Sequence, residues 1–363
     1  MSWRRALIVT SLASAALLAA VVAASCFSAG CSSLGYYAQA VGGHMDMMTR
    51  AKPVSTLLQD AAEPAPLLER LALSQRIRDF ASSELALPDN PSYRGYADLQ
   101  RGAVVWNVVA APELGLTLKT WCFPVLGCVG YRGYFDRASA DAMAAELQRE
   151  GWEVSVYGVP AYSTLGWTNW IGGDPLLNTF IHWPEGELAR LIFHELAHQV
   201  AYAHDDTTFN ESFATAVERI GGERWLSTRA SDAARAEYAD FDARRKSFRE
   251  LAARQRQRLL QLYASGISDD EKRQRKLELK AQLQADINEL KTGPWRGFTG
   301  YDAWFARANN ASYAVQAAYN ELVPAFERLY QQQGSDLTRF YAEVQRLSAL
   351  PKTERRATLG ALP

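Results

Sequence analysis

The sequence predicts a mostly α-helical protein with a small α+β part and a long antiparallel helical hairpin. Three observations support this fold class. Apolar residues recur at helical spacing in most segments, strand-like runs are confined to residues 103–157, and the charged stretch 229–291 carries two sparse apolar stripes. With 363 residues, of which 48% are hydrophobic and 22% charged, the chain can bury a sizeable core.

The first half of the chain is predicted to hold all the strands. Prolines near positions 53 and 64–66 divide a helical region, because proline cannot continue a helix. β-branched and aromatic residues predict the strands, and Gly151 fits the end of the helix before the last of them. In chain order we expect a divided helix over 36–87, a strand over 103–109, a candidate strand within 128–135, a helix over 139–150, a strand over 152–157 and a loop over 158–174.

The second half is predicted to be helical. Glu185 and Glu187 are favourable in the first turn of a helix that begins at Pro184 and runs to about Ala203. Ser268 forms a capping box with the glutamate three residues later, at the start of one long helix. The remaining helices are expected over 209–220, ending at Gly221 and Gly222; over two long segments within 229–291, separated at Gly266; and near 313–333 and 336–347. The charge of the hairpin is typical of a solvated face rather than of a binding site.

The N-terminus has the features of an export signal. A basic start at Arg4 and Arg5 precedes an apolar stretch of small residues over 6–24, and further small residues follow it. The apolar stretch is nearly long enough to span a bilayer, so an uncleaved membrane anchor is the alternative. We therefore expect residues 1–30 to be a signal peptide.

The end of this segment resembles the lipobox of bacterial lipoproteins. Ala29 and Gly30 precede Cys31, although Ser28 stands where the lipobox usually has Leu. The resemblance implies that Cys31 becomes a lipid-modified N-terminus, which holds the protein on a membrane without spanning it. Cys26 is the alternative site. The expected location is the periplasm, and the serine after Cys31 favours the outer membrane.

Two cysteines remain in the exported part of the chain. An oxidising periplasm would let Cys122 and Cys128 form a disulfide across a small loop that contains Pro124 and Gly127, both turn formers. Two buried free thiols are the alternative. A metal site is disfavoured, because no other cysteine lies near in the sequence.

A His-Glu-x-x-His motif carries the chemistry. His194 and His198 are four residues apart, so on a helix both imidazoles lie on one face and can reach one Zn²⁺. Glu195 points aside, where it can take a proton from a zinc-activated water and pass it to the leaving amine. The motif therefore predicts zinc-dependent peptide hydrolysis. Two histidines that are merely buried and hydrogen-bonded are the alternative.

A catalytic zinc usually has a third protein ligand. We favour Glu211, because the chain after His198 is long enough to finish one helix, turn, and present this carboxylate from the next helix, as in the gluzincins. A capping box with Thr208 is the alternative role for Glu211.

Other residues compete for the third position. His204 has the metzincin spacing, but that family has Gly where this chain has Ala201, and no methionine follows Met143 to form a Met turn. Asp205 and Asp206 could act as in the aspartate-zincins, or could begin the second helix.

Glu218 is a further candidate near the motif. It follows Glu211 by seven residues, on roughly the same face of the predicted helix. From there it could orient one of the two histidines or hold the free amine of a substrate. An ordinary surface salt bridge is the alternative.

Several motifs in one order resemble a family of bacterial zinc aminopeptidases that are predicted periplasmic lipoproteins. They are GCSSLGYYAQ at 30–39, WCFPV at 121–125, YRGYF at 131–135, AYSTLGW at 161–167, DP at 174–175, HELAHQ at 194–199 and FNESFA at 209–214. The resemblance covers most of the mature chain and is weakest in the hairpin. It implies zinc bound by His194, His198 and Glu211, with Glu195 as base, and gives little about the substrate.

A tyrosine hydroxyl could stabilise the oxyanion that forms during peptide hydrolysis, as in many gluzincins. The candidates are Tyr162, Tyr202, Tyr301, Tyr313 and Tyr319, and core packing is the alternative for each. Residues 162–170 could line a substrate cleft or pack in the interior.

The predictions combine into an exported, lipid-anchored zinc peptidase. We expect a signal peptide over 1–30, a peptidase core over 31–226, a hairpin insertion over 227–293, and C-terminal helices over 294–363 that complete the core. Expected partners are a peptide or protein substrate and a membrane; a net charge of -1 provides no basic field for nucleic acid.

Three functions are compatible with these features. An aminopeptidase is favoured, an envelope endopeptidase is the first alternative, and a non-enzymatic zinc lipoprotein whose hairpin binds a partner is the second. The presence of Glu195 argues against the last function, because a structural zinc site needs no base.

Overall fold

The computed structural model describes residues 31–362, except 124–126, 162–163, 165, 167–168 and 170–171. The expected signal peptide, Cys26, Tyr162 and most of the 162–170 loop therefore lie outside the described residues. Among the described helices, none combines the length and the apolarity that crossing a bilayer requires.

The described chain is mostly helical, with three small sheets, which confirms the predicted combination of helices with a small α+β part. The helices are α2 (Cys31–Arg50), α3 (Val54–Leu57), α4 (Ala65–Ser83), α5 (Arg137–Arg149), α6 (Glu185–Ala197), α7 (Thr207–Thr228), α8 (Asp232–Ala264), α9 (Asp269–Thr292), α10 (Asp302–Arg307), α11 (Asn310–Ala318), α12 (Val323–Gln332), α13 (Leu337–Ser348) and α14 (Lys352–Gly360). The strands are β1 (Lys52–Pro53), β2 (Gly95–Ala97), β3 (Val105–Pro112), β4 (Trp121–Phe123), β5 (Gly127–Val129), β6 (Arg132–Tyr134), β7 (Trp152–Val159) and β8 (Leu176–Leu177).

The main sheet has the antiparallel order β6-β3-β7 and is covered on both faces. Side chains alternate along a strand, so Val108 and Ala110 of β3 pack in the cluster with α5, while Val109 and Ala111 pack in the cluster with α11. This explains why β3 is an almost continuous apolar run. The expected strand within 128–135 is in fact two short strands, β5 and β6, which pair with different partners.

α6 is shorter than the sequence predicts, because it ends at Ala197 rather than near Ala203. The chain turns instead between His198 and the start of α7. The amide side chain of Asn210 accepts a hydrogen bond from the backbone N–H of Ala203 at 2.7 Å and donates one to its carbonyl at 2.9 Å. These two bonds satisfy backbone groups that a continued helix would otherwise pair.

α7 is longer than predicted, because it continues through Gly221 and Gly222 to Thr228. A Cβ on Gly221 would lie 2.8 Å from Cδ2 of Phe193, and one on Gly222 would lie 2.7 Å from Cγ of Arg190. The glycines therefore allow α7 to approach α6 closely and do not terminate the helix. Periodicity within α7 could not reveal this, because the constraint comes from another element.

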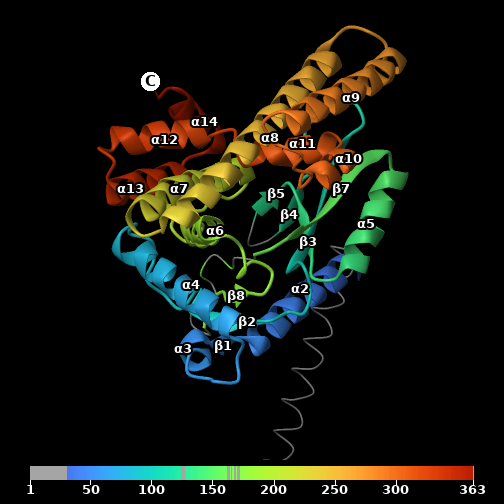
Figure 1. The fold of residues 1–363 in the computed structure, drawn as a ribbon. Coiled ribbons are helices and arrows are strands. Elements are labelled where there is room, and N and C mark those ends of the chain that lie inside the picture. Colours follow the sequence, from blue (N-terminus) through green and yellow to red (C-terminus); the bar gives the residue numbers. More distant parts are fainter. Residues whose placement is uncertain are drawn as a thin grey trace, which may run out of the picture.

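α6 and α7 lie at the centre of the molecule (Figure 1). The largest buried cluster joins them to α4, α12 and α13. The long helices α8 and α9 run side by side and project away from the rest of the chain. Ser268 caps α9 by accepting a hydrogen bond from the N–H of Glu271 at 3.3 Å, and Leu283 and Ile287 are the residues of α9 that are buried.

Candidate metal centre

Two helices bring three ligand atoms to one point. His194 and His198 lie one turn apart at the end of α6, and Glu211 lies in the second turn of α7. His194 Nε2 is 3.2 Å from His198 Nε2, and the Oε2 atom of Glu211 lies 3.4 Å and 3.7 Å from these two nitrogens. Ligands of a tetrahedral zinc are separated by about 3.3–3.6 Å, so this donor set fits a metal ion of that kind.

The three side chains are almost removed from solvent. His194, His198 and Glu211 are each less than 10% exposed. Burial raises the pKa of Glu211, but the charges and hydrogen bonds of the two histidines outweigh it and lower the pKa to about 2. Burial lowers the pKa of His194, yet its bonds to Glu211 and Glu218 raise it well above 6.5. The negative charge of Glu211 is therefore balanced by a proton on His194. A divalent cation bound at the same place can replace that proton.

Glu218 lies behind one of the histidines. Its Oε2 atom is 2.9 Å from Nδ1 of His194, and its Oε1 atom accepts a hydrogen bond from Arg190. Burial raises the pKa of Glu218, but Arg190 and His194 outweigh it and hold the pKa well below its usual range. An ionised carboxylate at Nδ1 keeps the proton on that nitrogen and leaves Nε2 free to bind a metal.

The pKa of Glu195 shifts in the opposite direction to that of Glu211. Burial raises the pKa of Glu195 above 4.5, although the two histidines oppose that shift. Tyr93 is close enough to this carboxylate that Glu195 contributes, after burial, to raising the tyrosine's pKa. Its hydroxyl is buried with no hydrogen-bond partner among the described residues, and its backbone has φ 64°. Both features are unfavourable for an ordinary core residue and concentrate at functional sites.

Among the candidate tyrosines that the structure describes, Tyr319 lies beside a candidate ligand. The ring of Tyr319 stacks on that of His194, with centroids 6.4 Å apart and planes 20° apart. Burial raises its pKa well above 10, and Glu211 adds to the effect, so the hydroxyl stays protonated. Tyr301 and Tyr313 belong instead to the hydrophobic cluster at the base of the hairpin.

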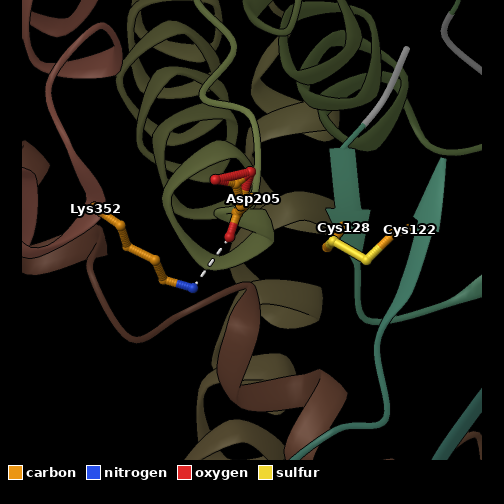
Figure 2. The surroundings of a disulfide bond; sticks show 4 residues. All are labelled: Cys122, Cys128, Asp205 and Lys352. Carbon is orange, nitrogen blue, oxygen red and sulfur yellow. Dashed lines mark hydrogen bonds between the residues drawn. A yellow bond between two sulfur atoms is a disulfide. The ribbon is translucent and has the colours of Figure 1, made fainter. Parts of the chain in front are cut away.

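The competing ligands do not join the cluster. His204 is exposed, and its ring contacts Tyr202. Asp205 is also exposed, and its carbonyl accepts a hydrogen bond from Lys352 at 3.0 Å (Figure 2). Asp206 is 1% exposed and begins α7, where it accepts a hydrogen bond from the N–H of Phe209. Thr208 is therefore not the residue that caps α7.

A disulfide joins Cys122 of β4 to Cys128 of β5. The small hairpin that it closes packs against the turn between α6 and α7 (Figure 2). Gly127 has φ 73°, and a Cβ there would lie 3.1 Å from the backbone nitrogen of Asp205. The disulfide-bonded hairpin therefore supports the turn that leads from His198 to Glu211.

Sequence reasoning missed Arg190, Asn210 and Tyr93. Arg190 offered a signal, since it is a single cation in an otherwise apolar stretch of α6, one turn before His194. Asn210 and Tyr93 offered none, because their roles depend on residues brought near by folding.

Comparison with known proteins shows which family the chain belongs to. No curated protein and no solved structure matches the chain significantly. A family model described as "Putative aminopeptidase" matches residues 35–359 and so includes every residue of the metal centre. The chain belongs to this aminopeptidase family.

Proposed function

We propose that this protein is a zinc-dependent metallopeptidase, and specifically an aminopeptidase. The observation that carries the proposal is the convergence of His194 Nε2, His198 Nε2 and a Glu211 oxygen, with all three ligand atoms within 4.8 Å of one another. Two imidazoles and one carboxylate are the donor set of many catalytic zinc sites, which keep a fourth position open. Family membership supports peptide hydrolysis as the reaction.

Zinc bound by these residues would act as a Lewis acid on the scissile carbonyl and lower the pKa of a water. Glu195 would accept a proton from the attacking water and donate it to the leaving amine. Its raised pKa suits this exchange, because a carboxylate nearer neutrality both accepts and returns a proton readily. Glu218 and Arg190 keep His194 in the required orientation and tautomer.

Tyr319 is the proposed donor to the oxyanion. Its ring stacks on His194, and its raised pKa keeps the hydroxyl proton in place at neutral pH. A neutral donor held by packing costs little reorganisation as negative charge develops on the carbonyl oxygen.

An endopeptidase remains the second candidate function, and one observation favours it. An aminopeptidase needs an acidic group for the free amine of its substrate, but both oxygens of Glu218 already face protein groups, Arg190 and His194. Peptides with free and with acetylated N-termini distinguish the two functions: an aminopeptidase cleaves only the free form, and an endopeptidase cleaves both.

The deciding experiment compares wild-type protein with Glu195→Gln, both beginning at residue 32. The variant should keep about one zinc per chain by elemental analysis, because residue 195 is not a ligand, while peptide turnover falls by about 10²–10⁴-fold. Full zinc with unchanged turnover would contradict the role of Glu195. Protein without zinc and without turnover would contradict the metallopeptidase itself.

The proposal includes export and a lipid anchor at Cys31. It is supported by the basic start, the apolar stretch and the small residues before Cys31. Cys31→Ser should remove the acyl chains from the protein, which its mass after detergent extraction measures, whereas Cys26→Ser should keep them. Loss of the acyl chains in the second variant alone would place the anchor at the earlier cysteine.

A further inference from the structure

Helix α2 has an apolar side that faces solvent. Among the residues that the structure describes, large hydrophobic side chains are exposed at five positions, and three of them lie on α2: Tyr37, Val41 and Met45, which are 42%, 64% and 50% exposed. They are spaced by four residues, so they lie on one face of the helix. The face that a helix turns to water is usually polar. The exposed side of α2 therefore indicates an interaction surface.

The apolar character of this side is continuous near the start of the helix. Between positions 35 and 45, the exposed residues are Gly35, Tyr37, Ala38, Val41, Gly42 and Met45. No Asp, Glu, Lys or Arg occurs in the sequence between positions 31 and 45. Charge returns at the other end of the helix, where Asp46 and Arg50 form an ion pair at 2.9 Å. The apolar stretch therefore belongs to the part of α2 that follows Cys31.

The opposite side of α2 holds the helix against the rest of the protein. Met47 is buried in the largest cluster, and Tyr36 packs against the cluster that includes α5. The side-chain oxygen of Gln39 accepts a hydrogen bond from the N–H of Phe135 at 2.9 Å. A Cβ on Gly43 would lie 2.1 Å from Cγ of Phe135, so this glycine allows the close approach. These contacts fix the direction in which the apolar side faces.

The position of the proposed lipid anchor agrees with that direction. Position 31 is the first residue of α2. It precedes Ala38 by seven residues and Met45 by fourteen, which is about two and four helical turns, so the three positions lie near one line along the helix. Met45 is about 21 Å from position 31 along the axis, at a rise of about 1.5 Å per residue. Acyl chains at Cys31 would therefore enter a bilayer next to the exposed apolar side.

We propose that the apolar side of α2 docks on the surface of the bilayer that holds these acyl chains. The inference rests on the proposed lipid anchor, which would keep α2 within its own length of the membrane. Tyr37 suits the headgroup region, because its ring is apolar and its hydroxyl is polar, and Val41 and Met45 suit the boundary with the acyl chains. The absence of carboxylates from positions 31–45 avoids repulsion by anionic lipids. Docking would fix the orientation of the metal centre relative to the membrane.

The test places a polarity-sensitive fluorophore on α2 in the exported, acylated protein. Cys122 and Cys128 are joined in a disulfide and Cys31 would be acylated, so an introduced cysteine is the reactive thiol of the mature chain. Val41→Cys carries the label. Leu277→Cys is the matched control, because the two side chains are 64% and 61% exposed and the hairpin that carries Leu277 projects away from α2 (Figure 1). Both proteins are reconstituted into vesicles of phosphatidylethanolamine and phosphatidylglycerol, with and without nitroxide-labelled lipid.

The label at residue 41 should emit at shorter wavelength than the label at residue 277, and nitroxide lipid should quench only the former. Met45→Asp should abolish both effects at residue 41, because a charge is costly to bury at the membrane boundary, whereas Leu277→Asp should preserve them. Equal emission or equal quenching at the two labelled positions overturns the proposal. Emission at shorter wavelength without quenching would mean that a second copy of the chain covers α2, which overturns the membrane as the occupant.

The mass of the protein after detergent extraction separates this inference from the anchor on which it rests. Acylated protein whose label at residue 41 is not quenched keeps the anchor and loses the docking surface. Protein without acyl chains overturns both. If circular dichroism shows that Met45→Asp is unfolded, Met45→Ser makes the same comparison.

Discussion

Glu218 Oε2 lies 2.9 Å from Nδ1 of His194, on the ring nitrogen that does not face Glu211. This contact connects the metal centre to the interior of the protein, because Arg190 holds the other carboxylate oxygen and donates a further bond to the hydroxyl of Tyr238 in α8 at 2.8 Å. The base of the hairpin therefore helps to position a metal ligand.

Glu218→Gln should weaken zinc binding by about 10–100-fold, because the amide cannot hold the proton on Nδ1 as firmly as an ionised carboxylate. The measurement is competition with a chromophoric chelator. Glu223→Gln, an exposed position on the same helix, is the control and should bind zinc as the wild type does. Equal affinities for the two variants would remove Glu218 from the metal centre.

Glu211→Ala should lose zinc on dialysis, whereas His204→Ala should retain it. Glu211 contributes an oxygen within 3.7 Å of both histidine nitrogens, while His204 is exposed on the turn. Elemental analysis of both variants, purified side by side, measures the difference. The opposite order would restore the metzincin ligand set.

Tyr319→Phe should reduce kcat by about 10²–10³-fold and leave zinc content and KM nearly unchanged, as expected for a donor that acts on the oxyanion. Tyr301→Phe is the control, since its ring packs against Phe248 at the base of the hairpin. A loss confined to KM, or an equal loss in both variants, would mean that the Tyr319 hydroxyl does not act on the transition state.

Zinc affinity should rise with pH. Burial lowers the pKa of His194, but the bonds to Glu211 and Glu218 raise it well above 6.5, and a protonated histidine cannot bind a metal. Below this raised pKa each bound zinc displaces one proton, so the association constant gains up to about tenfold per pH unit. Chelator competition from about pH 6 to about pH 9 covers the range in which histidine titrates. A pH-independent affinity would contradict the protonated state of His194 in the metal-free protein.

Metal-free protein should show the opposite dependence in its stability. A raised folded-state pKa means that protonated His194 stabilises the fold below pH 6.5, and this contribution is lost as pH rises through the raised value. Thermal unfolding of protein freed of metal by a chelator, at the same pH values, measures this loss of stability with rising pH.

Gly221→Ala should destabilise the fold by about 1 kcal/mol. The added Cβ would lie 2.8 Å from the ring of Phe193 and 2.7 Å from Leu85, and overpacking of this kind costs about 1–3 kcal/mol against a helix-propensity gain of about 1 kcal/mol. Gly266→Ala is the control, because nothing lies within 4 Å of its Cβ position. Stabilisation by Gly221→Ala would mean that α6 and α7 are less tightly packed than the structure describes.

The local parts of the fold could be predicted from the sequence. The histidine pair, the acidic first turn of α6, the strand character of residues 105–112 and the cap at Ser268 all follow from residues close together in the chain. The ends of α6 and α7 could not be predicted, because they depend on Asn210 and on the close approach of the two helices.

The sequence by itself therefore determined that two histidines and a carboxylate lie together on one helix, since helical spacing alone brings His194 and His198 to one face beside Glu195. Only the tertiary structure brought Glu211 rather than His204 to the two histidines, gave Glu218 its partner Arg190, and placed Tyr319 against His194. The physical reason is distance along the chain. Contacts within one helical turn are set by backbone geometry, whereas contacts between helices depend on how all their side chains pack together.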